Sequence, residues 1–146
     1  EAVEDSNVFM PTGLSAEFDD LLKKYGLHLP LPTWLPEGLT YDSTDVISDD
    51  EVSTDIMGKF YDGRKIVFVG VTRLHLKGTA FDMFLEKDDR LYKELEHRGQ
   101  RYIIYSNASC INAFWYAPPY VCVINTRISE NELLKMINSI PERRLL

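Results

Sequence analysis

The aromatic side chains towards the C-terminal end of the chain are the residues best suited to specific contacts. Trp115 and Tyr116 are adjacent, Tyr120 follows after a pair of prolines, and Trp34 lies far upstream. Tyr and Trp combine a large apolar surface with one polar atom, which favours interfaces and ligand sites. Because neighbouring residues of a strand point to opposite faces, Trp115 and Tyr116 cannot both enter one core. We predict that one of them is exposed near the prolines. Packing within the protein is the first interpretation of these aromatic residues, and the functional alternative is that all four are candidate contacts to a partner or ligand.

Residues that could support catalysis or bind a metal do not form a recognisable motif. The three histidines are far apart, and none stands near another ligand type at a metal-binding spacing. The acidic run from Asp42 to Glu51 lacks the Asp-rich, Gly-containing loop and the distal Glu of a calcium site. Gly-x-Ser-x-Gly and Gly-rich phosphate loops are also absent from the sequence. We predict no catalytic residues, no metal, no cofactor and a protein that is not an enzyme.

The two cysteines are predicted to remain unbridged. If a turn is centred on Pro118 and Pro119, Trp115 lies opposite Cys122. Cys110 then lies on the order of 17 Å further along its strand, at roughly 3.3 Å per residue. That separation exceeds the ~7 Å limit between the Cα atoms of a disulfide. The alternation of side chains also places the two thiols on opposite faces of the sheet.

Size and charge limit the classes to which the protein belongs. The 146 residues suit a single domain, which we assign to residues 15–146 behind a polar lead-in, residues 1–14. The net charge of −7 argues against a nucleic-acid partner. No apolar run approaches the ~20 residues of a membrane span, and no signal peptide is present. We therefore expect membrane attachment only through an anchor upstream of Glu1.

Trp115, Tyr116 and Tyr120 lie on or beside a predicted hairpin that is followed by a helix. The β-rich runs 111–116 and 120–124 flank Ala117-Pro118-Pro119, which predicts a hairpin. Ser129 and Glu132 have the spacing of a capping box, in which each side chain accepts from the other residue's backbone N–H. Apolar residues at helical spacing continue to the next proline. A sheet covered by an amphipathic helix is the expected core.

The N-terminal part predicts a second helix and an extended connector. Ser15 is a suitable N-cap, acidic residues follow it, and two lysines precede a stop at Gly26. Residues 29–38 contain three prolines, so we expect an extended connector there, held by Trp34 and Leu35.

The strongest short hairpin signal is Asp62-Gly63. It separates the β-rich runs 53–61 and 64–76, and a two-residue loop would place Tyr61 opposite Arg64. The second of these runs is apolar on both faces at its start, which predicts a central strand.

The remaining segments complete the predicted sheet. Residues 40–47 predict a first strand, and residues 78–86 alternate apolar and polar side chains like a half-buried strand. Residues 88–100 fit a short helix or a strand that turns into the run after Gln100, and we favour the strand. We expect an α+β domain with a curved, mainly antiparallel sheet of about six or seven strands and the N-terminal and C-terminal helices packed on it.

Several short motifs of the chain occur together in a fixed order. They are Leu35-Pro36-Glu37-Gly38-Leu39, Gly99-Gln100-Arg101-Tyr102, Trp115, Tyr120, Ile124, Ser129-Glu130-Asn131-Glu132-Leu133-Leu134 and Ser139-Ile140. In these motifs the chain resembles the bacterial domain-of-unknown-function family 4367, from Leu35 to Ile140. It departs from the family pattern at Leu39, where Tyr is frequent, and in the Pro-Pro turn. The resemblance implies an extracytoplasmic domain, often behind a membrane helix or lipid anchor, and brings no known catalytic residues.

These expectations favour a sensing or protein-interaction domain without catalytic activity, at the surface or membrane of a bacterium. The alternative is a carrier of an apolar small ligand or lipid between sheet and helices, and a hydrolase comes third. An apolar cavity would favour the carrier, an exposed aromatic patch the interaction domain, and a buried carboxylate or thiol beside a histidine the enzyme. The expected partner is a protein or an apolar small molecule.

Overall fold

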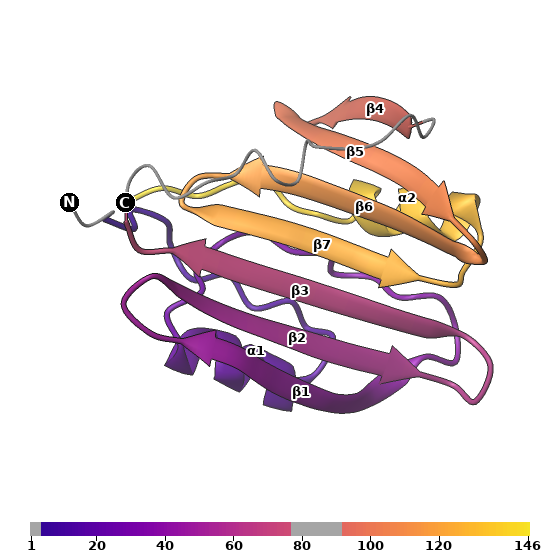
Figure 1. Cartoon of the computed structure of the whole chain (residues 1–146), viewed down its shortest axis with the longest axis horizontal. Coiled ribbons are helices and arrows are strands. Elements are labelled where there is room, and N and C mark those ends of the chain that lie inside the picture. Colours follow the sequence, from indigo (N-terminus) through magenta and orange to yellow (C-terminus); the bar gives the residue numbers. More distant parts are fainter. Residues whose placement is uncertain (1–3, 77–91) are drawn as a thin grey trace.

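The computed structural model describes residues 4–76 and 92–146. In these residues the chain forms one sheet of seven antiparallel strands in the order β1-β2-β3-β7-β6-β5-β4, and the sheet does not close into a barrel (Figure 1). The strands are β1 (Thr40–Asp49), β2 (Ser53–Tyr61), β3 (Ile66–Leu74), β4 (Tyr92–His97), β5 (Gln100–Asn107), β6 (Cys110–Ala117) and β7 (Tyr120–Thr126). The predicted α+β fold is thus confirmed.

Two meanders make up the sheet. Strands β1 to β3 follow one another in space, as do β4 to β7, and the meanders join where Val69 of β3 lies opposite Ile124 of β7. β3 is therefore a central strand, as its apolar start predicted. The strand predicted over residues 78–86 lies outside the described residues.

Both helices, α1 (Ala16–Lys24) and α2 (Glu130–Asn138), lie on the same face of the sheet. In Figure 1 they are seen behind it, with α1 near β1 and β2 and α2 near β5 and β6. One face of the sheet therefore carries the helix-covered core.

Helix α1 begins and ends where the sequence predicted. The Ser15 side chain accepts from the backbone N–H of Phe18, and Gly26 follows the helix with a φ of 70°. Because this φ lies in the left-handed region, glycine suits the position. Phe18 and Leu22 form the buried side of the helix.

Helix α2 carries the predicted capping box. The Ser129 side chain accepts from the N–H of Glu132, and the Glu132 carboxylate accepts from the N–H of Ser129. Leu133, Met136 and Ile137 are fully buried against the sheet side of the helix. A capping interaction contributes about 1 kcal/mol, so most of the stability of the helix comes from this packing.

The core lies between the sheet and the helices. Val67, Val69 and Val71 of β3 alternate towards it, and all three are fully buried. Cys122 lies opposite Val71 and is buried in the same layer. Full burial of a side chain of this size contributes about 1.5–3 kcal/mol, which makes this layer a main source of stability.

The β6–β7 hairpin has the predicted register. Trp115 lies opposite Cys122, with the turn at Pro118-Pro119. Both cysteines are free, Cys122 in the core and Cys110 half-buried. Since Cys110 is an odd number of positions from Trp115 along β6, its side chain points to the other face, as the alternation predicted.

The register predicted for the β2–β3 hairpin is wrong by two residues. Tyr61 lies opposite Ile66, not Arg64, so the loop is longer than the Asp62-Gly63 pair alone. The Asp62 carboxylate accepts from the backbone N–H groups of Arg64 and Lys65, and these hydrogen bonds stabilise the longer turn. A shift of two preserves the alternation, so the predicted faces are retained.

The connector before β1 is extended, as predicted, but its buried contacts differ. Leu29 and Leu31 are 1% and 2% exposed, whereas Trp34 and Leu35 are only half-buried. The prolines keep the segment extended, so alternate leucines face the core while Trp34 remains nearer the surface.

Residues 88–100 were predicted to form a strand in preference to a helix, and strand β4 confirms this for the described residues from 92 onward. It pairs with β5, with His97 opposite Gln100 across the two-residue turn Arg98-Gly99. Arg98 and Gly99 have φ values of 52° and 80°. Two positive φ values in a two-residue turn define the tight hairpin type that matches the twist of the strands.

The two ends of the chain lie side by side. Asn7 forms an isolated antiparallel bridge with Leu145, and the Arg143 Nε donates to the Asn7 side-chain oxygen. Asn7 and Met10 are buried, so residues ahead of α1 pack on the domain. No helix in the described ranges is long and apolar enough to span a membrane.

Candidate functional site

The structure separates the four candidate contact residues. Trp115 is 3% exposed on the helix-bearing face, whereas Tyr116 is 38% exposed on the opposite face. The prediction that one of this pair is exposed is confirmed. Tyr120 is on the same face as Trp115 and is fully buried, and Trp34 lies on the connector. These residues do not form one aromatic patch.

Tyr120 ties the N-terminal segment to the core. Its hydroxyl donates to the Asp5 carboxylate and accepts from the backbone N–H of His28 at 2.9 Å. Burial and the neighbouring Asp5 carboxylate raise the pKa of the Tyr120 hydroxyl. The hydroxyl therefore stays protonated, and Tyr120 has the surroundings of a packing residue.

Trp34 contacts the end of α2. The Lys135 Nζ lies 5.7 Å from the centre of the Trp34 ring, and the Thr33 N–H donates to the Ser139 hydroxyl at 2.9 Å. A cation over a Trp face contributes about 0.5–1 kcal/mol at an exposed site. This contact fastens the connector to α2.

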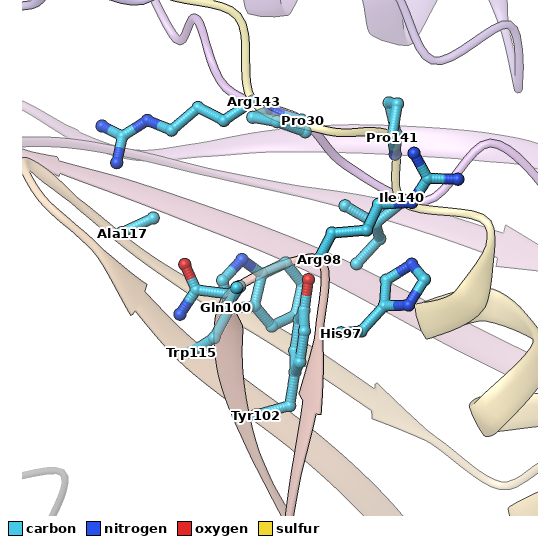
Figure 2. A pocket seen from close by; sticks show the side chains of 11 residues that line it. Pro30, His97, Arg98, Gln100, Tyr102, Trp115, Ala117, Ile140, Pro141 and Arg143 are labelled. Atoms are coloured by element: carbon cyan, nitrogen blue, oxygen red, sulfur yellow. The ribbon is translucent and has the colours of Figure 1, made fainter.

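Trp115 lines a cavity between the β4–β5 turn and the segment that follows α2 (Figure 2). The cavity has a volume of about 150 Å³. Its lining residues are Pro30, His97, Arg98, Gly99, Gln100, Tyr102, Trp115, Ala117, Ile140, Pro141 and Arg143. In Figure 2, His97 and Arg98 lie on one side of Tyr102, and Gln100 and Trp115 lie on the other.

Two aromatic rings form the inner wall of the cavity. The ring centres of Tyr102 and Trp115 are 5.1 Å apart, at an angle of 57°. Both residues are nearly inaccessible, at 1% and 3% exposure, because they also belong to the core. Burial raises the pKa of the Tyr102 hydroxyl, so this group remains a hydrogen-bond donor across the physiological range.

His97 lines the cavity and contains a buried polar atom. Its Nε2 is inaccessible to solvent and has no hydrogen-bond partner among the described residues. A buried nitrogen without a partner typically costs about 1–3 kcal/mol, so native proteins rarely leave one unused. His97 therefore contributes to the wall of the cavity and carries a ring nitrogen that no described residue satisfies.

The rim of the cavity is positively charged. Arg98 and Arg143 are both exposed, and neither forms an ion pair within residues 4–76 and 92–146. Among the described residues, none that lines the cavity is Asp or Glu. The rim is therefore a positively charged region in a chain whose net charge is −7.

The family profile described as "Domain of unknown function (DUF4367)" matches residues 29–140. The chain belongs to this family. The match covers the connector, the sheet and α2, and it includes every cavity residue except Pro141 and Arg143. No curated protein and no solved structure matches the chain.

Sequence reasoning identified Trp115 but missed most of the cavity in this DUF4367 domain. His97, Arg98 and Tyr102 come from the β4–β5 hairpin, and Arg143 comes from the far end of the chain. These residues come together only through the order of the strands in the sheet, which no local pattern in the sequence reveals. One local signal was available, since Arg occupies a turn position that Asn, Asp or Gly usually takes.

The other chemically reactive groups of the DUF4367 domain are not arranged as a catalytic centre in the described residues. Burial raises the pKa of the Cys122 thiol well above its ordinary value, so this thiol stays protonated and is a poor nucleophile. His75 bonds through Nε2 to the Thr54 hydroxyl at 2.7 Å, and that hydroxyl donates to Asp49. This network fastens the ends of β1, β2 and β3. No cluster of metal ligands occurs in the ranges that the structure describes.

Proposed function

We propose that the domain is a non-catalytic recognition module that binds a protein partner through the cavity beside the β4–β5 turn. The observation that carries the proposal is the cavity itself, with its aromatic wall, its positive rim and the His97 Nε2, which has no partner among the described residues. A cavity of about 150 Å³ holds a molecule the size of benzene in an engineered protein. The space therefore suits one side chain or chain end of a partner.

The alternative, a carrier of an apolar ligand or lipid, is less well supported by this cavity. Sites for drug-sized ligands usually have about 300–1,000 Å³, which is larger than the 150 Å³ available here. The arginines and the unpartnered His97 nitrogen also suit a polar group better than a hydrocarbon chain. The hydrolase has no observation in its favour.

The proposal includes a location outside the cytoplasm, with the domain attached through an anchor upstream of Glu1. Its support is the family resemblance, which implies an extracytoplasmic, often anchored domain. Protease treatment of intact cells tests it: digestion of the domain while a cytoplasmic marker survives is the expected result. Protection until the cells are lysed would contradict the location.

Photo-crosslinking tests the recognition function. A photoreactive residue in place of Pro141, which lines the cavity, should capture a specific protein, while the same residue in place of Ile47 should not. Ile47 is a matched control because it is 57% exposed on the edge strand β1, far from the cavity along the sheet.

The captured protein is then purified and its affinity measured by calorimetry. Ala117→Leu fills part of the cavity and should weaken binding at least about tenfold, a loss of about 1.4 kcal/mol. Ile47→Ala should leave the affinity unchanged. Equal capture from Pro141 and Ile47, or full affinity in a folded Ala117→Leu protein, would contradict the proposal.

A further inference from the structure

The described lining of the cavity offers several hydrogen-bond donors and contains no acidic side chain. The Tyr102 hydroxyl forms no hydrogen bond with any described residue, and burial keeps it protonated. The His97 Nε2 is buried without a described partner and can donate when it carries the proton. Donors of this kind favour a ligand that accepts hydrogen bonds.

Arg98 adds a full positive charge that is placed by the backbone. Its φ of 52° lies in the left-handed region, where a non-glycine residue is disfavoured by about 1–2 kcal/mol. The tight turn fixes the start of the side chain, and Figure 2 shows its guanidinium on the His97 side of the cavity. Such uncommon backbone conformations concentrate at binding and catalytic sites.

Arg143 contributes charge to the rim but has other partners. Its Nε donates to the Asn7 side chain and one Nη donates to the Pro118 carbonyl, each at 2.5 Å. In Figure 2 its guanidinium points away from Tyr102 and His97. Among the lining residues, Arg98 is therefore the arginine without a hydrogen bond or ion pair to a described residue, and a single guanidinium suits a monoanion better than a doubly charged phosphate.

The remaining surface of the cavity is apolar. Pro30, Ile140 and Pro141 contribute aliphatic groups, and Trp115 contributes a ring face. These groups would cover the uncharged part of a ligand. The cavity volume of about 150 Å³ limits that part to about the size of one ring or branched side chain.

Building on the proposed function, we infer that the cavity binds a carboxylate attached to a compact apolar group. Arg98 binds the carboxylate, the Tyr102 hydroxyl and the His97 Nε2 complete its hydrogen bonds, and Trp115 packs on the apolar part. Two sources present this chemistry: the C-terminal residue of a peptide and a free organic acid. Both sources carry the same carboxylate, and peptides with a free or an amidated C-terminus distinguish them.

The two tryptophans provide the readout. In a ¹H–¹⁵N NMR spectrum each indole N–H gives one signal, and Trp34→Phe identifies which signal belongs to Trp115. Sodium benzoate is the probe, because it joins one ring to one carboxylate. Benzoate should shift the Trp115 signal with saturation, while the uncharged benzamide should bind at least about tenfold more weakly. The Trp34 signal should stay in place.

Arg98→Gln tests the residue assignment. It should weaken benzoate binding about fivefold to tenfold, because one charge-assisted contact is lost. Arg64→Gln removes the same charge from the exposed β2–β3 turn and should change the affinity less than twofold. Equal weakening by both variants, or binding of inorganic phosphate more tightly than benzoate, would overturn the carboxylate assignment.

Short peptides ending in Phe distinguish the sources and separate this inference from the proposed function. If the free-acid peptide binds and its amide does not, the carboxylate site and the protein partner are both supported, and the ligand is the C-terminal residue of a peptide. Binding of benzoate without binding of any peptide supports the carboxylate site and contradicts a protein partner there. If the free-acid peptide and the amide peptide bind equally and benzoate does not bind, the carboxylate assignment is overturned, whereas the proposal of a protein partner is retained. If neither benzoate nor any peptide shifts the Trp115 signal, the carboxylate site and the protein partner at this cavity are both overturned.

Discussion

The ring of Phe18 in α1 occupies the space that a side chain at Gly58 of β2 would need. A Cβ added at Gly58 would lie 2.6 Å from the Phe18 Cε1 atom and 2.8 Å from Cδ1. Real Cβ atoms do not approach other atoms so closely. Since the Phe18 ring also meets the Phe60 ring edge-on, with centres 5.6 Å apart, it has little freedom to withdraw. The glycine therefore sets how closely α1 approaches the sheet.

Gly58→Ala should destabilise the domain through this contact. Overpacking a core of this kind typically costs about 1–3 kcal/mol, which urea unfolding would measure. Phe18→Leu makes room for the new methyl group, so the double variant should be more stable than the sum of the single effects predicts. Strict additivity of the two changes would show that Phe18 is not the obstacle.

The hydroxyl of Tyr120 should be structural. Tyr120→Phe leaves the His28 N–H and the buried Asp5 carboxylate without this partner, at a cost of about 1–3 kcal/mol. The same variant should bind the cavity ligand with unchanged affinity, because Tyr120 is not among the lining residues. Thermal unfolding and the benzoate titration measure the two effects. Loss of binding in a folded Tyr120→Phe protein would contradict this assignment.

Local patterns in the sequence predicted the elements, and several side-chain directions with them. The alternation of strand residues required that Trp115 and Tyr116 face opposite sides, and Ser129 with Glu132 marked the start of α2. The Asp62-Gly63 pair located a hairpin but not its register, because the Asp62 carboxylate stabilises a longer loop that propensity alone does not reveal.

The cavity could not be predicted in the same way. It depends on the position of β5 beside β6 and on the return of the C-terminal segment across their ends, which places Arg143 near the β4–β5 turn. Those are long-range relationships, and no periodicity within one segment encodes them. Tyr120, taken from sequence as a candidate contact, lies in the core instead because its side chain points to the helix-bearing face, the same face as Trp115 and Cys122.

The stability contributed by Glu132 should depend on pH. The hydrogen bond from Lys65 Nζ, at 2.9 Å, and the backbone N–H of Ser129 hold the pKa of the Glu132 carboxyl below its ordinary range. A pKa that folding lowers stabilises the protein above the unfolded-state pKa, and this contribution is lost as the pH falls through the folded-state pKa.

The stability gap between the native protein and Glu132→Gln should therefore be largest near neutral pH and shrink as the pH falls from about 5 towards 3. Thermal unfolding at each pH measures it. Glu37→Gln, at an exposed position, removes the same charge and serves as the reference for general charge effects. A gap that stays constant over this range would contradict the role of Glu132.

Arg98 should reduce stability while it supports binding. Asn tolerates the left-handed conformation better than Arg, so Arg98→Asn should stabilise the domain by about 0.5–1 kcal/mol and still weaken benzoate binding. Ala108, with a φ of 50° in the β5–β6 turn, gives a matched control. Ala108→Asn should bring a similar gain in urea unfolding and leave binding unchanged, since Ala108 does not line the cavity. If Arg98→Asn instead lowers stability as well as binding, the arginine contributes to folding, and its position in the turn does not indicate selection for a ligand.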